Sequence, residues 1–334
     1  MSYESERRVA VQAVLQACRL CQAVGVSLTS KETMDKEDKS PVTVADFGTQ
    51  ALINLNLMEA FPNDPITAEE DSANLRTPEG AIIRKKIIEH VNAISPGLSE
   101  EEILAAIDRG NYKGGSKGRF WTLDPIDGTK GFLRGDQYAI ALALIENGEV
   151  VLGVLGCPNF PIDDINSDRR RGCLFIASRD EGATMRLFDD AAERAIKVTD
   201  IDNPQRASFC ESFESGHSSH SDAARITEIL GVTVPPVRID SQCKYATIAR
   251  GDASIYLRLP TRADYVEKIW DHAAGWIIVK EASGEVTDVY GNPLDFSVGP
   301  TLSRNTGVVA TNGKIHSEVI SAVRQVLETK EKKK

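Results

Sequence analysis

The sequence lacks any apolar run that approaches the roughly 18 residues of a membrane-spanning helix. Its N-terminus, Met-Ser-Tyr-Glu-Ser-Glu, is acidic and has neither an apolar core nor an arginine-rich stretch, so we expect no targeting peptide. Positive charge is also scarce, since 39 Lys and Arg against 49 Asp and Glu give a net charge of −10. Proteins that bind nucleic acid by neutralising phosphates are normally basic. These absences predict a cytoplasmic protein without a membrane or nucleic-acid partner.

Cysteine is sparse as well, with six residues scattered through a chain that shows no secretory signal. This distribution predicts reduced thiols rather than disulfides. Cys18 and Cys21 form a C-x-x-C pair, but they lie within a helical pattern and no second pair follows. We therefore expect them to pack within a helix and not to bind zinc.

The 334 residues are enough for two domains or one large α/β unit. In the first half, apolar spacing and capping signals predict helices at 9–24, 46–61, 82–91 and 99–107, with a loop at 31–40. Strands follow at 120–123, 138–145, 150–155, 173–177 and 183–187, and Asn147-Gly148 predicts a tight hairpin turn. In the second half, helices at 221–230, 242–250 and 271–282 alternate with strands at 237–239, 254–259 and 308–311, before a last helix. The pattern predicts an α+β domain at 1–195 and an α/β domain at 196–334.

The strongest chemical signal is the run Asp124-Pro125-Ile126-Asp127-Gly128-Thr129, which directly follows the strand expected at 120–123. Side chains at the carboxyl end of a strand lie where open α/β sheets bind ligands. Two carboxylates that converge repel each other unless a hard divalent cation lies between them. The run therefore predicts a Mg²⁺ site, with the Thr129 hydroxyl beside it and the N–H groups of the following turn available to a phosphate. A surface turn rich in Asp and Gly is the alternative for this run alone.

Three further acidic positions have ordinary structural interpretations when each is taken alone. Glu69, in Glu69-Glu70-Asp71, is typical of a solvated loop, whereas Asp46 and Asp271 are typical of helix N-caps. Oxygen ligands dispersed along the chain are nevertheless what a Mg²⁺ site requires. Both interpretations stay open at this point.

In their order along the chain, these motifs resemble those of the lithium-sensitive, Mg²⁺-dependent phosphatases, of which inositol monophosphatase is the best-known member. The resemblance rests on Glu69-Glu70, on Asp124 to Thr129, and on Trp270-Asp271-His272-Ala273-Ala274-Gly275. Within that superfamily the chain is similar to the 3′(2′),5′-bisphosphate nucleotidases. The motifs that carry this second similarity are Gly118-Arg119-Phe120-Trp121, Asp127 to Gly135, Gly216-His217-Ser218-Ser219-His220, Asp240-Ser241-Gln242 with Lys244, and Tyr256-Leu257-Arg258-Leu259-Pro260. The resemblance covers about residues 39–312, departs at Ala68 where relatives often carry Gly, and implies a layered α-β-α-β-α sandwich of the inositol monophosphatase-like type.

The resemblance implies a role for each matching position. Asp46 and Thr129 would be the catalytic pair that orients and deprotonates the attacking water. The Mg²⁺ ions, about two or three per site, would be held by Glu69, Asp124, Asp127, Asp271 and the main-chain carbonyl of Ile126. The substrate would be bound by Gly128, Thr129, His217, Ser241, Lys244, Arg258 and Asp271. Taken alone, His217 would be interpreted as a loop residue and Lys244 as a solvated helix residue.

The implied reaction is hydrolysis of the 3′-phosphate of adenosine 3′,5′-bisphosphate to AMP and phosphate, by in-line attack of a metal-activated water. The 5′-phosphosulfate analogue is a second expected substrate. The resemblance further implies a monomer that is sensitive to lithium and sodium and that removes a by-product of sulfur assimilation, with a bearing on salt tolerance.

Other functions fit the sequence less well. A haloacid-dehalogenase type of phosphatase has its nucleophile two positions before the acid, whereas Asp124 and Asp127 are three positions apart. Gly114-Gly115-Ser116-Lys117-Gly118 matches a hydrolase nucleophile motif, but no strand precedes it. A catalytically silent nucleotide sensor is disfavoured because every expected metal ligand and Thr129 are present. Inositol polyphosphate 1-phosphatase or inositol monophosphatase activity remains the alternative.

Overall fold

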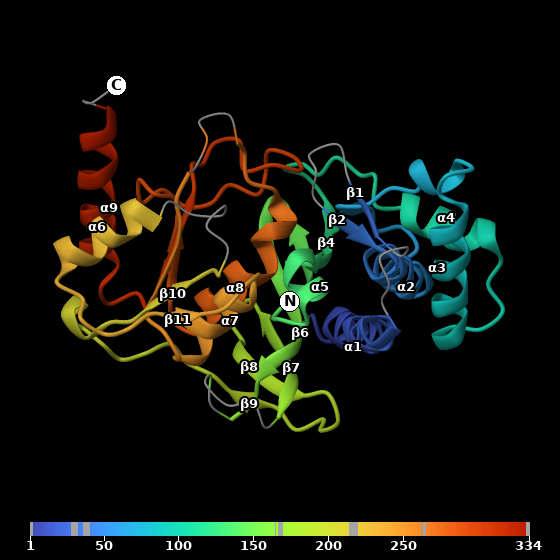
Figure 1. The fold of residues 1–334 in the computed structure, drawn as a ribbon, viewed down its shortest axis with the longest axis horizontal. Helices are drawn as coiled ribbons and strands as arrows, with labels where there is room; N and C mark the ends of the chain where they lie inside the picture. Colours follow the sequence, from blue (N-terminus) through green and yellow to red (C-terminus); the bar gives the residue numbers. More distant parts are fainter. Residues whose placement is uncertain are drawn as a thin grey trace.

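The computed structural model describes residues 3–27, 33–35, 41–163, 165, 170–213, 220–260, 262 and 265–331. These residues form five layers, helix, sheet, helix, sheet and helix, which follow one another across Figure 1. The expected α-β-α-β-α sandwich is therefore confirmed. Among the described residues, no helix is both long and apolar enough to cross a bilayer.

The first helical layer, at the right of Figure 1, consists of helices predicted from the sequence. They are α1 (Glu4–Ser27), α2 (Val44–Ala60), α3 (Ala81–Ile94) and α4 (Glu100–Asp108). The apolar face of α1 packs against α2 and the middle of the adjacent sheet, and it buries both Cys18 and Cys21. Burial raises the pKa of the Cys18 thiol well above its usual value. All six cysteines are buried free thiols, as expected.

The second layer is a seven-stranded sheet in the order β3-β4-β5-β6-β7-β8-β9. Its strands are β3 (Ile66–Ala68), β4 (Arg119–Asp127), β5 (Ala139–Glu146), β6 (Glu149–Pro161), β7 (Arg171–Ser178), β8 (Gly182–Leu187) and β9 (Arg194–Ala195). Only β3 and β4 pair in parallel; the other neighbours are antiparallel. The predicted hairpin joins β5 to β6, with Asn147 and Gly148 both at positive φ (54° and 84°), as a type I′ turn requires.

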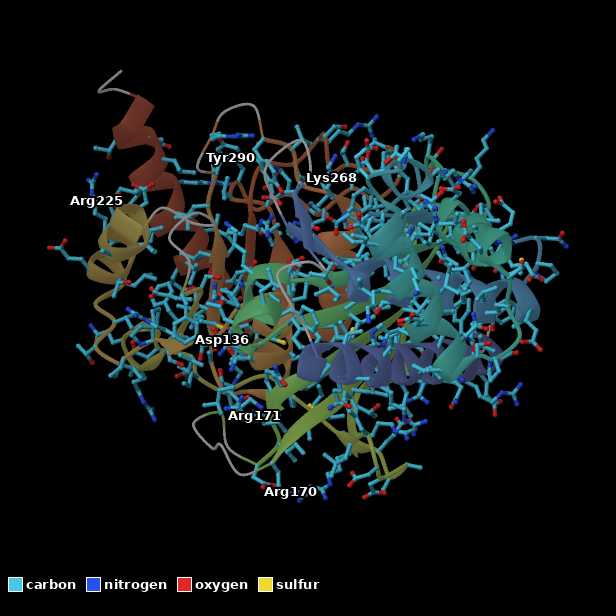
Figure 2. The ribbon with its side chains drawn as sticks, turned by 45° about the vertical axis from the view of Figure 1, so that its right-hand side comes forward. Asp136, Arg170, Arg171, Arg225, Lys268 and Tyr290 are labelled. Carbon is cyan, nitrogen blue, oxygen red and sulfur yellow. The ribbon has the colours of Figure 1, made fainter. Side chains whose placement is uncertain are left out.

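The fourth layer is a five-stranded sheet in the order β11-β10-β12-β14-β13. Its strands are β10 (Phe209–Glu211), β11 (Val237–Arg238), β12 (Ile255–Arg258), β13 (Glu285–Thr287) and β14 (Val308–Thr311). The outermost layer, at the left of Figure 1, contains α6 (His220–Leu230) and α9 (His316–Glu331). Charged side chains such as Arg225 on α6, Lys268 and Arg170 lie on the outside at different ends of the molecule (Figure 2).

The predicted loop at 31–40 is wrong in one part, because β1 (Thr33–Asp35) pairs with β2 (Pro41–Thr43). Strands β3, β9, β10 and β13 were not predicted either. Each has two or three residues, which is too short to display an alternating pattern.

The middle layer, α7 (Cys243–Arg250) and α8 (Ala273–Glu281), joins the two sheets. Helix α8 packs on β5 to β8, while α7 packs on β10, β12 and β14, and the two helices contact each other. The chain passes from one sheet to the other between β9 and β10, yet one continuous core around α7 and α8 contacts both. The division into domains at 195/196 stays a prediction.

Close contact between α7 and α8 depends on Gly275. A Cβ at this position would lie 2.8 Å from the Cβ of Tyr245 and would overlap its ring, which is fully buried. We predict that Gly275→Ala lowers the free energy of unfolding by about 1–3 kcal/mol, measured by urea denaturation, because the added methyl overpacks the core. Gly25→Ala, in α1, is the matched control, since its Cβ would meet only Phe132, at 3.6 Å. The control should be neutral or stabilising by up to about 1 kcal/mol, and an equal loss in both variants would contradict the assignment.

Candidate active site

The sequence predicts a strand that ends at residue 123, before the acidic run. In the structure β4 continues to Asp127, so Asp124 and Asp127 belong to the strand itself. Asp124 pairs with Ala141 and Asp127 with Ala139, so β4 has one more residue than β5 in this interval. Side chains three positions apart normally point to opposite faces of a strand, and an extra residue reverses that alternation. The bulge therefore allows Asp124 and Asp127 to face the same side of the sheet.

Strand β3 places Glu69 beside this bulge. Ala68 lies opposite Leu123 in the parallel pair, so the next residues along the chain, Glu69 after β3 and Asp124 within β4, lie at the same level of the sheet. The side-chain amide of Gln50 holds the following residue, Glu70, because it accepts from the Glu70 N–H at 3.0 Å and donates to the Glu70 carbonyl. Glu70 is buried, whereas Glu69 and Asp71 are exposed. The solvated-loop alternative is therefore wrong for Glu70 only, and the role of Glu69 as a metal ligand stays a prediction.

Asp46 lies in the first turn of α2, but it is not the N-cap. Thr43 is the N-cap, and Asp46 is the third helical residue of a capping box. Its Oδ2 accepts from the Thr43 N–H (2.8 Å) and from the Thr43 hydroxyl (2.6 Å). Its Oδ1 faces the Thr129 hydroxyl at 3.4 Å. One carboxylate therefore caps a helix with one oxygen and contacts Thr129 with the other.

Thr129 begins the short helix α5 (Thr129–Arg134), directly after Gly128. Its hydroxyl also lies 3.2 Å from the carbonyl oxygen of Ile126. The structure thus brings the predicted pair Asp46 and Thr129 together, and it places the Ile126 carbonyl next to them.

Lys244 is buried, with only 7% of its surface exposed. Its Nζ donates to the Ser212 hydroxyl at 3.1 Å and lies 5.4 Å from the centre of the Tyr256 ring. Burial lowers the pKa of Lys244, and the nearby negative charge of Asp127 opposes that shift. The alternative that Lys244 is a solvated helix residue is therefore wrong.

Arg258, at the end of β12, is shared between two acids. Its Nε donates to Glu267 at 2.8 Å, and its Nη2 lies 3.3 Å from Oδ2 of Asp271. Burial raises the pKa of Glu267, but Arg258 and His272 outweigh it and lower the pKa to about 2. Glu267 therefore carries a full negative charge at neutral pH.

Asp271 is not a helix N-cap either. It ends the short 3₁₀ helix η4 (Ile269–Asp271), and His272 takes the N-cap position of α8 without a side-chain capping bond. Burial raises the pKa of Asp271 well above its usual value; Arg258 opposes this shift, and the charges of Asp127 and Glu69 add to it. These three carboxylates, from η4, β4 and the end of β3, are thus close enough to repel one another.

A small cavity of about 60 Å³ lies where these elements meet. Six predicted site residues line it: Asp127, Gly128, Ser241, Lys244, Arg258 and Asp271. The lining also includes Arg134 and Asp240, which form a 2.8 Å ion pair, and the unpredicted Ser212. Ser212 follows a strand of three residues and belongs to no motif, so no sequence signal marks it. The predicted His217 lies outside the described residues.

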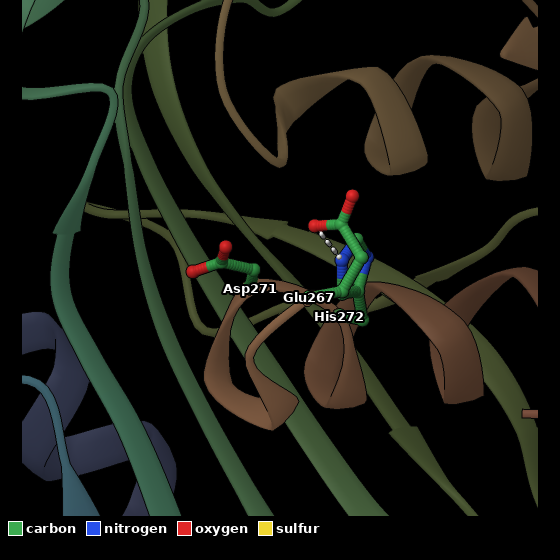
Figure 3. A group of neighbouring side chains, drawn as sticks. All are labelled: Glu267, Asp271 and His272. Atoms are coloured by element: carbon green, nitrogen blue, oxygen red, sulfur yellow. Dashed lines mark hydrogen bonds and ion pairs between the residues drawn. The ribbon is translucent and has the colours of Figure 1, made fainter. Parts of the chain in front are cut away.

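Glu267, Asp271 and His272 offer ligand atoms within 4.8 Å of one another, and Figure 3 shows their arrangement. The carboxylate of Asp271 points away from the other two side chains, whereas Glu267 contacts Nε2 of His272 at 3.1 Å. Arg258 already pairs with both acids. A metal ion in this trio would have to displace a guanidinium, so the trio is a hydrogen-bonded ion cluster.

The predicted metal ligands offer a different set of donor atoms from this trio. Glu69, Asp124, Asp127 and Asp271 provide only carboxylate oxygens, and the Ile126 carbonyl is adjacent to Thr129. Hard divalent cations prefer such oxygen donors. The mutual repulsion that raises the pKa of Asp271 is what a bound cation would relieve. The donor set therefore fits Mg²⁺.

Comparisons with known proteins agree with this geometry. A sequence model described as the inositol monophosphatase family matches residues 2–328. A 3′(2′),5′-bisphosphate nucleotidase of Emericella nidulans is 48% identical over 98% of this chain and 99% of its own. 3′(2′),5′-Bisphosphate nucleotidase 1 of Arabidopsis thaliana is 46% identical over 99% of each chain. The resemblance inferred from the motifs is therefore confirmed.

Solved structures show the same fold. The Thermotoga maritima IMPase matches with a TM-score of 0.64 at 22% identity, covering 96% of both chains. The inositol monophosphatase from Anabaena matches with a TM-score of 0.61 at 20% identity, covering 97% of both. The expected type of layered sandwich is confirmed.

The turn at Gly128 yields a test of how the two halves of the site fit together. Gly128 has a φ of 89°, and a Cβ there would lie 2.8 Å from the Cβ of Ser241, which itself has a φ of 64°. Gly135, at the other end of α5, has a φ of 76°, and no described atom would lie within 4 Å of its Cβ. Alanine at either position costs about 1–2 kcal/mol in backbone strain. We predict that Gly128→Ala loses about 1–3 kcal/mol more than Gly135→Ala in urea denaturation, through the clash with Ser241; equal losses would contradict this contact.

Proposed function

The chain belongs to the inositol monophosphatase family, and from this premise we propose that it is a 3′(2′),5′-bisphosphate nucleotidase. The proposed reaction converts adenosine 3′,5′-bisphosphate and water to AMP and phosphate, and it extends to the 5′-phosphosulfate analogue. One observation carries the proposal: a single cavity is lined by two carboxylates suited to a metal, Asp127 and Asp271, and by two cations, the buried Lys244 and the half-buried Arg258. A substrate with two phosphates needs fixed cations besides the metals, because only one phosphate can lie at the reacting centre.

Metal dependence is general in this family, and we propose Mg²⁺ as the ion, about two or three per site. Glu69, Asp124, Asp127, Asp271 and the Ile126 carbonyl would hold these ions. When bound, they would supply an activated water and neutralise negative charge on the phosphoryl group. Lithium and sodium would inhibit by competing for this carboxylate cluster.

The residues Asp46 and Thr129 would move the proton of the attacking water. The Thr129 hydroxyl has one proton and two acceptors in reach, the Ile126 carbonyl at 3.2 Å and Asp46 Oδ1 at 3.4 Å. Of these acceptors, only the carboxylate can take up a proton as a base. Thr129 can therefore receive the water's proton while it passes its own to Asp46, whose other oxygen is fixed by Thr43. The fixed geometry keeps this relay aligned before substrate arrives.

The second phosphate and the nucleoside would lie on the opposite side of the cavity. There Gly128 and Ser241 form the wall, and Lys244 and Arg258 provide the charge. His217 would complete this side. The alternative activity, on inositol phosphates, would use the same carboxylates but leave part of this cationic wall without a ligand. For this reason we expect it to be minor.

The first prediction from this proposal concerns the metal. Asp127→Asn keeps the size of the side chain and removes one negative charge, so it should lower kcat by about 10³-fold or more through lost electrostatic stabilisation. Wild-type protein should also melt at a higher temperature in Mg²⁺ than in EDTA, and the variant should show a smaller increase. Full activity in EDTA, or a variant with wild-type kcat, would contradict the proposed site.

The second prediction separates chemistry from recognition. Thr129→Ala should lower kcat and leave KM nearly unchanged, because its contribution arises as water is activated. Lys244→Ala should mainly raise the KM for adenosine 3′,5′-bisphosphate, by about 10- to 150-fold for one lost charge-assisted contact. The same change should have little effect on inositol monophosphate hydrolysis.

Lys280→Ala is the control for this pair, since Lys280, in the last turn of α8, forms an ion pair with Glu285 at the surface and does not line the cavity. It should leave both KM values unchanged. If Lys244→Ala raised KM equally for adenosine 3′,5′-bisphosphate and inositol monophosphate, Lys244 would not be a nucleotide contact. The proposal would then be limited to a general sugar phosphatase.

A further inference from the structure

Glu267 is a buried carboxylate that the proposed reaction does not use. Only 6% of its side chain is exposed, and it does not line the cavity. One oxygen, Oε2, is close to two donors, Nε of Arg258 at 2.8 Å and Nε2 of His272 at 3.1 Å. Glu267 therefore contacts a cavity residue, Arg258, without lining the cavity itself; Figure 3 shows Glu267 beside His272.

The contact with Glu267 restricts the direction of the Arg258 guanidinium. A guanidinium is planar and its donors have a fixed fork geometry, so a partner at Nε determines where the two Nη atoms point. With Nε on Glu267, Nη2 of Arg258 lies 3.1 Å from the Tyr265 hydroxyl and 3.3 Å from Asp271 Oδ2. Arg258 thus contacts Asp271, a proposed metal ligand, through Nη2, while its Nε contacts Glu267.

Glu267 is also linked to the second cation of the cavity. His272, which it contacts, lies 2.7 Å through Nδ1 from the hydroxyl of Tyr245. The Tyr245 ring packs edge-on against Tyr256, with ring centres 5.1 Å apart, and Tyr256 lies beneath Lys244. A chain of buried contacts therefore runs from Glu267 to both cations.

We infer that Glu267 is a positioning residue that holds Arg258 toward the nucleotide and prevents a full ion pair between Arg258 and Asp271. The inference rests on the proposed function, since it assigns Arg258 to substrate. Without the charge of Glu267, Asp271 becomes the carboxylate that attracts Arg258 most strongly. The guanidinium would then turn toward Asp271 and away from the second phosphate.

The test is a double-mutant cycle on the full-length protein. Glu267→Gln keeps the shape of the side chain and removes its charge, so the KM for adenosine 3′,5′-bisphosphate should rise about tenfold or more, while kcat at saturating Mg²⁺ and substrate changes by less than about threefold. Arg258→Gln should raise KM by at least as much. The double variant should match Arg258→Gln alone, because Glu267 acts through Arg258. If the two effects multiply, Glu267 acts independently of Arg258 and the inference is overturned.

Two further variants keep the result interpretable if Glu267→Gln is poorly folded. Glu267→Asp retains the charge on a shorter side chain, so its KM should lie much closer to the wild-type value than that of Arg258→Gln does. A KM as high as that of a folded Glu267→Gln, or as high as that of Arg258→Gln, would oppose the inference. Glu285→Gln removes a surface carboxylate and should leave KM unchanged. The dissociation constant of AMP, measured by calorimetry, should follow the same order as KM.

The outcomes also separate this inference from the proposed function. A wild-type protein that neither hydrolyses adenosine 3′,5′-bisphosphate nor binds AMP would overturn both. A wild-type protein that does both, with multiplicative losses in the cycle, would overturn the role of Glu267 alone.

Discussion

Repulsion among carboxylates is the constraint on which this structure depends. Glu69, Asp127 and Asp271 come from different elements, yet they are near enough to raise the pKa of Asp271 together with burial. Such crowding destabilises a folded chain unless other groups compensate. Arg258 provides part of the compensation by pairing with Asp271, and a divalent cation would provide the rest. The fold can be understood as a scaffold that keeps these charges close against their repulsion.

Both sheets are needed for that purpose. The seven-stranded sheet, α2 and α5 contribute Asp46, Asp124, Asp127 and Thr129, while the five-stranded sheet, α7 and η4 contribute Lys244, Arg258 and Asp271. The backbone N–H of Gln242 donates to the carboxylate of Asp127, which ties the start of α7 to the end of β4. The core around α7 and α8 then fixes the distance between the two sets. Chemistry and substrate recognition are thus divided between two sheets that share one core.

Much of this arrangement is predictable from the sequence, because the relevant signals are local. The helices have regular apolar spacing, Ser99 and Glu102 form the expected capping box, and Asn147-Gly148 forms the expected turn. The run ending at Thr129 identifies the chemistry because its residue types and spacing are specific.

Other features depend on contacts that no local pattern records. The bulge that turns Asp124 and Asp127 to one side arises from the pairing of β4 with β5. The sequence leaves open whether Asp46 caps a helix or acts as a base. In the structure Oδ2 of Asp46 accepts from Thr43 at the start of the helix, and Oδ1 faces the Thr129 hydroxyl. Glu267 belongs to no motif in the sequence, and its contact with Arg258 is formed only in the folded chain.

The most direct measurement of the central claim is the identity of the product, followed by ³¹P NMR during turnover of adenosine 3′,5′-bisphosphate in Mg²⁺. If the carboxylates define the reacting centre and Lys244 and Arg258 hold the other phosphate, the spectra will show inorganic phosphate and adenosine 5′-monophosphate. Adenosine 3′-monophosphate as the product, or no reaction while inositol monophosphate is hydrolysed, would contradict the account.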